Sequence, residues 1–242
     1  TSLKNEELLY KIFGINAELL IDQAWGYEPC TMKDIKSYKP ETNSLSSGQV
    51  LHCPYDYEKT KLIVKEMAEQ LSLELVEKEL VTDQIVLTIG YDVSNLTNKE
   101  ILKEYKGEIT LDRYGRKVPK HAHGTINLEN KTSSTKEIMD ATMNLFERII
   151  NNKLLTRRIN ITANKVIYQK DIKKEKKYEQ IDLFTNYEEL NKKKEQEKKE
   201  KSLQNVMLNI KKKYGKNAII KGMNLVEGGT TIERNGQVGG HK

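Results

Sequence analysis

The chain of 242 residues contains few cysteines, prolines, phenylalanines or tryptophans, and no long apolar run. Its two cysteines, Cys30 and Cys53, are not spaced with a second Cys or a His in the way zinc ligands are, so neither a zinc site nor a disulfide framework is expected. A membrane-spanning helix needs about 18 or more consecutive apolar residues, and neither such a run nor a signal peptide is present. We therefore expect a reduced, cytoplasmic protein with no membrane partner.

Charge, by contrast, is abundant. The chain has 41 lysines and arginines against 35 aspartates and glutamates, which gives a formal net charge of +6. A positive excess favours association with a polyanion, although an ordinary lysine-rich surface gives the same balance. The chain begins with Thr1 directly before a helical pattern, so we expect it to be part of a longer protein.

The first part of the chain is helical and small. Residues 1–26 predict two short helices, the first ending at Gly14 and the second capped by Asn16. So few residues bury too little apolar surface to fold alone. Residues 27–43 contain prolines and few apolar side chains, and we interpret them as a linker.

Residues 44–169 predict an α+β domain. Alternating apolar residues indicate strands at 47–53, 85–91, 121–128 and 155–168, and apolar residues three or four apart indicate helices at 57–75 and 135–151. The order β-α-β-β-α-β is the split βαβ arrangement, a four-stranded sheet with two helices on one face. A polar and basic excursion, residues 94–120, separates the second strand from the third.

One face of the predicted sheet is polar and carries no acidic residue. The last strand contributes Thr156, Arg158, Asn160, Thr162 and Asn164, the third His121, His123, Thr125 and Asn127, and the second Gln84 and Thr88. Such a face suits a phosphate backbone, whereas the alternative is an ordinary solvated sheet face. The histidines lie at i and i+2, but no acid or cysteine completes a metal site, so we assign no metal.

A short peptide follows the last strand, within a charged tether at residues 170–185. Gln180, Ile181, Asp182, Leu183 and Phe184 resemble the peptide by which bacterial DNA polymerases and repair proteins bind the sliding clamp. In such a peptide the Leu and Phe enter an apolar pocket and the Gln is a polar anchor. The same pair also fits a hydrophobic staple at the start of a helix.

Residues 186–242 predict a charged helix followed by a flexible C-terminal tail. The helix carries one apolar stripe, which requires a partner surface, and the tail is rich in glycine. The stripe consists of Leu203, Val206, Met207, Ile210 and Tyr214.

Taken together, these residues resemble the C-terminal half of a Y-family translesion DNA polymerase of the UmuC-like (ImpB/MucB/SamB) branch. Phe13-Gly14 and Ala24-Trp25-Gly26 resemble the end of the thumb domain, and residues 43–48 resemble the entry into the little finger domain. Residues 156–159 lie where the family carries basic residues, and residues 180–184 lie where its clamp-binding peptide follows the last strand. The resemblance covers almost the whole chain.

The resemblance implies a division of labour within an error-prone DNA-directed DNA polymerase used in repair and SOS-type damage tolerance. This chain would hold damaged primer–template DNA and the sliding clamp, and an accessory subunit is a further expected partner. The two divalent Mg ions would belong to a palm domain, of which no segment is recognised, so we expect no catalytic residue, metal or cofactor here. In a bacterial cell the protein would be associated with the nucleoid. The expected DNA-binding residues are Ser44, Ser46, Ser47, Gly48, Arg113, Arg116, Lys117, Arg157 and Arg158.

Two other classes of function remain open from the sequence. A nucleic-acid module with a ferredoxin-like sheet and no polymerase commonly presents aromatic residues for base stacking, whereas this face presents hydroxyls, amides and His. A protein-interaction module would use the charged helix and its apolar stripe, and would not need an acid-free sheet face.

Overall fold

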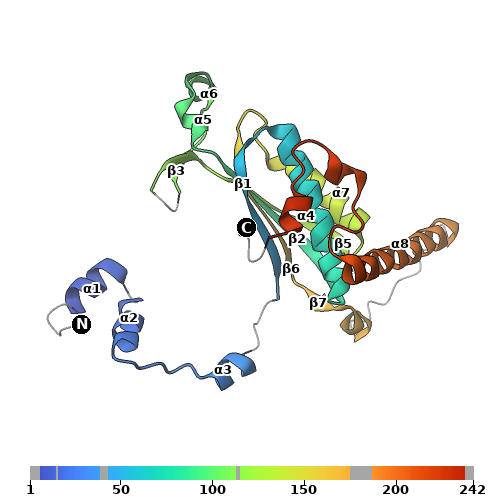
Figure 1. Ribbon diagram of the computed structural model, residues 1–242, viewed down its shortest axis with the longest axis horizontal. Helices are drawn as coiled ribbons and strands as arrows, with labels where there is room; N and C mark the ends of the chain where they lie inside the picture. The colour runs from blue at the N-terminus through green and yellow to red at the C-terminus, as the bar shows by residue number, and fades with distance from the viewer. Residues whose placement is uncertain (1–5, 15, 39–42, 113–114, 175–186, 238–242) are drawn as a thin grey trace. The chain divides into compact units, whose positions relative to one another are not determined.

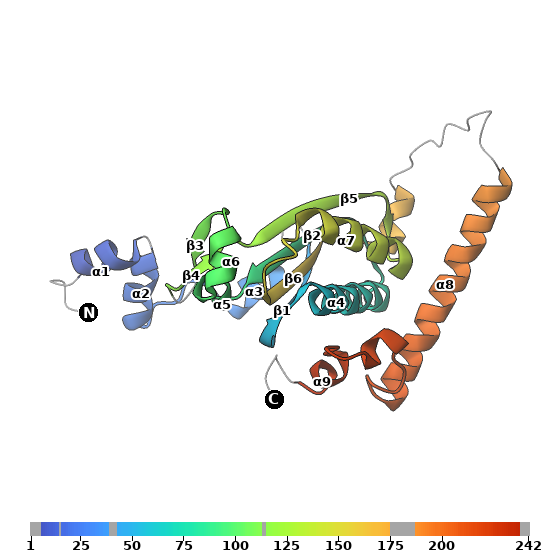
Figure 2. The same cartoon turned by 90° about the horizontal axis from the view of Figure 1, so that it is seen from above.

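The computed structural model describes residues 6–14, 16–38, 43–112, 115–174 and 187–237. Contacts divide the chain into two units, residues 1–41 and residues 42–242 (Figures 1 and 2). Within the described ranges, no helix has both the length and the apolar character that crossing a bilayer requires.

The first unit consists of three short helices, α1 (Glu6–Phe13), α2 (Asn16–Ala24) and α3 (Met32–Ser37). Gly14 ends α1 with a positive φ of 57°, a conformation that costs glycine little. Helix α3 lies in the expected linker, because Thr31 and Asp34 form a capping box there. The Thr31 side chain accepts from the Asp34 amide at 3.3 Å, and Asp34 accepts from the Thr31 amide at 2.9 Å.

The second unit contains the predicted sheet. Its strands are ordered β1-β6-β2-β5, and each neighbouring pair is antiparallel. It follows that β1 runs parallel to β2 across β6, and β5 runs parallel to β6 across β2, so each helix connects the strands of a split βαβ unit. The expected α+β architecture is confirmed. The elements are β1 (Leu45–Tyr55), α4 (Tyr57–Glu77), β2 (Leu80–Tyr91), β5 (Ala122–Thr132), α7 (Thr135–Ile149) and β6 (Thr156–Asn164).

The core lies between the sheet and the two helices α4 and α7, which cover the same face (Figure 2). Ile85, Leu87 and Ile89 of β2 have no exposed surface. Gly124 of β5 permits the close approach of α7, since a Cβ there would lie 2.8 Å from side-chain atoms of both Leu145 and Ile149.

The basic excursion between β2 and β5 is structured. It contains α5 (Ser94–Thr97), α6 (Lys99–Glu104) and a hairpin of β3 (Ile109–Leu111) and β4 (Lys117–Pro119). The Asn98 side chain caps α6 by accepting from the amide of Glu100 at 2.9 Å.

The last predicted strand is divided in two. Strand β6 ends at Asn164, and Lys165 adopts a positive φ of 52°. The chain then forms β7 (Ile167–Tyr168), which pairs with the start of β2, and the 3₁₀ helix η2 (Gln169–Lys174).

The C-terminal part forms a further layer on α4. It consists of α8 (Tyr187–Tyr214), η3 (Gly222–Leu225) and α9 (Thr231–Asn235), although the sequence predicted a flexible tail. Two glycines allow this packing: Gly228 adopts a φ of 92°, and a Cβ on Gly229 would lie 3.0 Å from the Glu66 Oε1 atom. In this tail glycine therefore permits a turn and close approach to α4 rather than flexibility.

Candidate nucleic-acid interface

The sheet face opposite α4 and α7 is lined by alternate residues of four strands, and we call it the open face. Period-2 alternation places these residues away from the core, and they are partly or fully exposed. The open face consists of Ser46, Gly48 and Val50 of β1, Arg158, Asn160, Thr162 and Asn164 of β6, Gln84, Val86, Thr88 and Gly90 of β2, and His123, Thr125 and Asn127 of β5.

Amide side chains form a row across three strands of the open face. Asn164 Nδ2 donates to Gln84 Oε1 at 3.2 Å, and Gln84 Nε2 donates to Asn127 Oδ1 at 2.8 Å. These bonds hold each amide in one orientation and leave its remaining donors and acceptors for a ligand.

Hydroxyl groups form further hydrogen bonds between neighbouring strands of the open face. The Ser46 hydroxyl lies 2.9 Å from Thr162 Oγ1 and donates to Asn160 Oδ1 at 3.0 Å. Thr88 Oγ1 lies 2.9 Å from His123 Nδ1. The open face therefore carries a network of neutral polar side chains, with Val50 and Val86 as its apolar members.

Acidic residues are kept away from this network. The four strands contain two acids, Asp83 and Glu129, and both lie where the pairing of β2 with β5 shifts register. The expected acid-free face is thus present throughout the regularly paired part of the sheet, which avoids repulsion of a phosphate backbone.

Arg158 supplies the positive charge of the open face. It is exposed and lies between Val50 of β1 and Gly90 of β2, and among the described residues its side chain makes no hydrogen bond or ion pair. Gly90 leaves room beside it, because a Cβ there would lie 3.3 Å from the Arg158 Cβ. Arg158 is thus available to an external anion.

Arg157 has a different environment because it is the extra residue of a β-bulge. Gly90 pairs with Arg158 and Tyr91 pairs with Thr156, which leaves Arg157 without a partner on β2. Its Nη1 donates to the His52 carbonyl oxygen at 3.1 Å, and its Nε lies 3.8 Å from Asp92 Oδ2. Within this chain Arg157 therefore connects the ends of β1 and β2.

The same bulge corrects the expected position of Thr156. Simple alternation put Thr156 on the polar face, but its side chain is fully buried because the inserted residue reverses the alternation.

The expected contacts at the start of β1 lie on two sides of the strand. Ser46 and Gly48 are on the open face, and Ser44 is exposed just before the strand. At Gly48 the backbone is bare, since an added Cβ would meet only the Ile159 carbonyl oxygen, at 4.0 Å. Ser47, in contrast, accepts a hydrogen bond from Arg234 on the covered side at 2.6 Å.

The basic hairpin has much of its charge balanced by acids. Arg116 pairs with Asp112, the Nη2 to Oδ2 distance being 2.7 Å, and Lys120 pairs with Glu108 at 2.6 Å. Lys117 is exposed on β4, and Arg113 lies outside the described residues. The hairpin therefore presents less unpaired charge than its sequence indicates.

The expected clamp-binding peptide, Gln180, Ile181, Asp182, Leu183 and Phe184, also lies outside the described residues. The helical stripe that follows it is divided. Met207 is buried, whereas Leu203 and Val206 remain at least half exposed.

Sequence reasoning missed the residues behind β1. Gln49 Nε2 donates to Thr230 Oγ1 at 2.7 Å, and Thr230 in turn contacts Glu66 of α4. Burial raises the pKa of the Glu66 carboxyl, although hydrogen bonds from Thr230 and Thr231 partly oppose this. No local sequence pattern relates residues so far apart in the chain.

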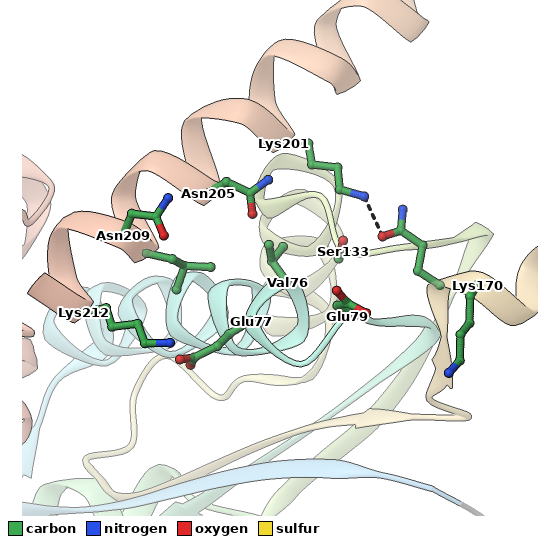
Figure 3. Close-up of a pocket in the computed structure, with 11 residues that line it drawn as sticks. Val76, Glu77, Glu79, Ser133, Lys170, Lys201, Asn205, Asn209 and Lys212 are labelled. Atoms are coloured by element: carbon green, nitrogen blue, oxygen red, sulfur yellow. Dashed lines mark hydrogen bonds between the residues drawn. The ribbon is translucent and has the colours of Figure 1, made fainter.

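A cavity of about 600 Å³ lies between the end of α4 and helix α8, away from the open face (Figure 3). Lysines and acids share its wall, among them Lys212 and Glu77, and Lys201 donates to Gln169 at 2.5 Å. This mixture of charges favours no single ligand. In the part of the chain that the structure describes, no three His, Cys, Asp or Glu side chains converge to hold a metal ion.

Comparison with known proteins supports one family. A search among curated proteins gives no match. Among solved structures, the chain is similar to the one titled "Insertion ternary complex of Dbh DNA polymerase", with 13% identity and a TM-score of 0.32. The match covers 67% of this chain and 39% of that chain, so this chain spans well under two thirds of the polymerase's length. The family described as "impB/mucB/samB family C-terminal domain" matches residues 43–183, which is more than half of the chain. The resemblance found in the sequence is thus confirmed: the chain belongs to the impB/mucB/samB family and carries its C-terminal domain.

Proposed function

We propose that this chain is the part of a translesion DNA polymerase that holds primer–template DNA and tethers the enzyme to the sliding clamp. Family membership supports the polymerase parentage. The observation that carries DNA binding is the open face, which combines exposed Arg158, the bare backbone at Gly48 and fixed hydroxyls and amides, with no acid in its paired part. Phosphoryl transfer is not assigned to these residues.

The chemistry of the open face suits the phosphate backbone better than the bases. Arg158 offers a charged fork of donors. The Ser46 hydroxyl would offer a short neutral contact once it turns from Asn160 to the phosphate, and Gly48 lets the phosphate approach the backbone closely. Contacts of this kind position a duplex without reading its sequence, which a polymerase requires because its template changes at every step. They also tolerate distorted, lesion-bearing DNA, because no base edge needs to match.

Salt dependence of binding tests this proposal. A fluorescently labelled primer–template duplex is titrated with the chain at several salt concentrations, with Arg158→Ala and Arg116→Ala alongside. Each phosphate contact adds about 0.9 to the slope of log K against log salt. We expect Arg158→Ala to lower that slope by about 0.9 and the affinity roughly tenfold near 0.1 M salt.

Arg116→Ala is the matched control, because it removes the same charged group from the hairpin. We expect it to change the slope by less, since Asp112 already holds the guanidinium. A larger loss for Arg116→Ala than for Arg158→Ala would place the DNA on the hairpin. Binding that is absent or independent of salt would leave the chain as a protein-interaction module.

Clamp tethering is tested separately with the double variant Leu183→Ala/Phe184→Ala. If the motif fills an apolar pocket, binding to an immobilised bacterial sliding clamp should fall at least about 100-fold, because two anchor side chains are lost. DNA affinity without the clamp should not change. In the intact polymerase such a tether raises the local concentration of a weak DNA-binding surface without adding a contact. Unchanged clamp binding by the double variant would remove this part of the proposal.

A further inference from the structure

Strand β1 carries part of the open face but lies at an edge of the sheet. Among the residues that the structure describes, it pairs with β6 on one side only, so its backbone is held by a single ladder. Ser46 and Gly48 face the open side, and the alternate residues Ser47 and Gln49 face the covered side, where both are only partly buried. An element packed against these two side chains would hold this part of the strand from behind.

Residues 216–237, which we call the C-terminal segment, supply those contacts. Arg234 Nη2 donates to Ser47 Oγ at 2.6 Å, and Arg234 Nη1 donates to Gln49 Oε1 at 3.4 Å. The Gln49 amide also donates to Thr230 Oγ1 at 2.7 Å. One guanidinium therefore binds both covered-side residues of this part of β1.

The C-terminal segment is itself fixed to α4. The Thr230 amide donates to Glu66 Oε2 at 2.9 Å, and both residues are buried. Glu227 pairs with Lys59 of α4, with the Nζ and Oε1 atoms 3.0 Å apart. Lys221 pairs with Glu69 of the same helix at 3.2 Å. The segment thus forms a connection from α4, through Arg234, to β1.

We propose that Arg234 is a positioning residue for the DNA grip, which fixes β1 from behind and so sets Ser46 and Gly48 at the open face. Consecutive residues of a strand point to opposite sides, so holding Ser47 and Gln49 also fixes Gly48 between them and Ser46 next to Ser47. This inference rests on the proposed function and deepens it. The C-terminal segment lies beyond residues 43–183, so this connection is not part of the matched family domain.

The charge of Arg234 is directed inward rather than toward DNA. Burial lowers the pKa of its guanidinium, although the carboxylates of Glu66 and Glu74 on α4 partly oppose this. Arg234 and Arg158 therefore have different roles. Arg158 would meet a phosphate directly, whereas Arg234 acts on the strand that carries the contacts.

Amide hydrogen exchange combined with DNA titration tests this role. We expect Arg234→Ala to speed exchange at least about tenfold for those amides of residues 46–50 that bond to β6, because two hydrogen bonds from a charged donor are lost. Exchange in the middle of β2 should not change. DNA affinity should fall roughly three- to tenfold, since a less ordered strand must be fixed on binding, and the salt slope should stay constant because no phosphate contact is lost.

Two further variants make the test specific. Arg234→Lys keeps the charge but loses the fork, so it should give the same changes to a smaller extent. Lys216→Ala removes one exposed charge from the same segment and should change neither readout. If Arg234→Ala does not fold, Arg234→Lys and Gln49→Ala are compared by the same two measurements.

The outcomes separate this inference from the proposed function. Unchanged β1 exchange would overturn the positioning role alone, and so would a salt slope lowered by about 0.9, which would mean that Arg234 contacts a phosphate itself. Failure of the unmodified chain to bind DNA would overturn the proposed function, and the positioning role with it. Faster β1 exchange with weaker binding at constant slope is the result we predict.

Discussion

The two faces of the sheet show how one set of strands serves two purposes. On the covered face, Leu87 has no exposed surface and packs in the core with α4 and α7. On the open face, its neighbour Thr88 is partly exposed and bonds across the sheet to His123. Residues one position apart therefore contribute to different properties, the covered face to stability and, in our proposal, the open face to DNA affinity. Single substitutions should separate the two.

Truncation of a core side chain on the covered face should have the largest effect, and that effect is on stability. Leu87→Ala leaves a cavity in the core and should lower the free energy of unfolding by about 2 to 5 kcal/mol. Thr88→Ala loses one partly exposed hydrogen bond and should cost about 1 kcal/mol or less. Urea denaturation of both variants measures the difference, and equal losses would show that the two faces do not differ in this way.

The second largest effect should be the loss of DNA affinity when an acid is placed on the open face. Asn160→Asp keeps an acceptor for the Ser46 hydroxyl and so should preserve the fold, but it adds a negative charge beside Arg158. We expect DNA affinity to fall roughly tenfold near 0.1 M salt, because the acid both repels phosphate and pairs with the arginine.

Asn209→Asp, on α8, is the matched control for this change, since it adds the same charge away from the open face. Fluorescence anisotropy with a primer–template duplex measures both variants. Equal losses would mean that only the net charge of the chain matters.

The smallest expected effect is the pH dependence of stability that comes from Glu66, on the covered side of the sheet. Burial raises the pKa of Glu66, so between the ordinary value, 4.5, and the raised value the folded state binds more protons than the unfolded state. Stability from this group is therefore lost as pH rises through that window. Glu66→Gln keeps an acceptor for the Thr230 amide and should remove this dependence. Thermal unfolding of both proteins from acid to neutral pH tests this, and parallel curves would contradict it.

Much of this arrangement was predictable from period-2 alternation. The strands and the acid-free face follow from which residues alternate, and both core helices follow from apolar residues three or four apart. Alternation failed where the backbone departs from it: the bulge at Arg157 buries Thr156 and turns Arg157 toward His52 and Asp92. Neighbouring arginines that look equivalent in the sequence therefore have different surroundings.

The contacts of the C-terminal segment could not be predicted. They join Arg234 to Ser47 and Thr230 to Glu66, across most of the length of the chain, so no local pattern indicates them. The glycines before Thr230 predicted flexibility, whereas their actual role is close packing on α4, which only the three-dimensional structure shows.

The most direct test of the central claim is to map the DNA on the protein by NMR. Amide chemical shifts of the isotope-labelled chain are recorded as a primer–template duplex is added. We predict that the largest changes lie in the open-face stretches 46–50, 84–90, 123–127 and 158–164, and are centred on Arg158. Changes confined to α8, the C-terminal segment or the β3–β4 hairpin, with the open face unaffected, would contradict the account.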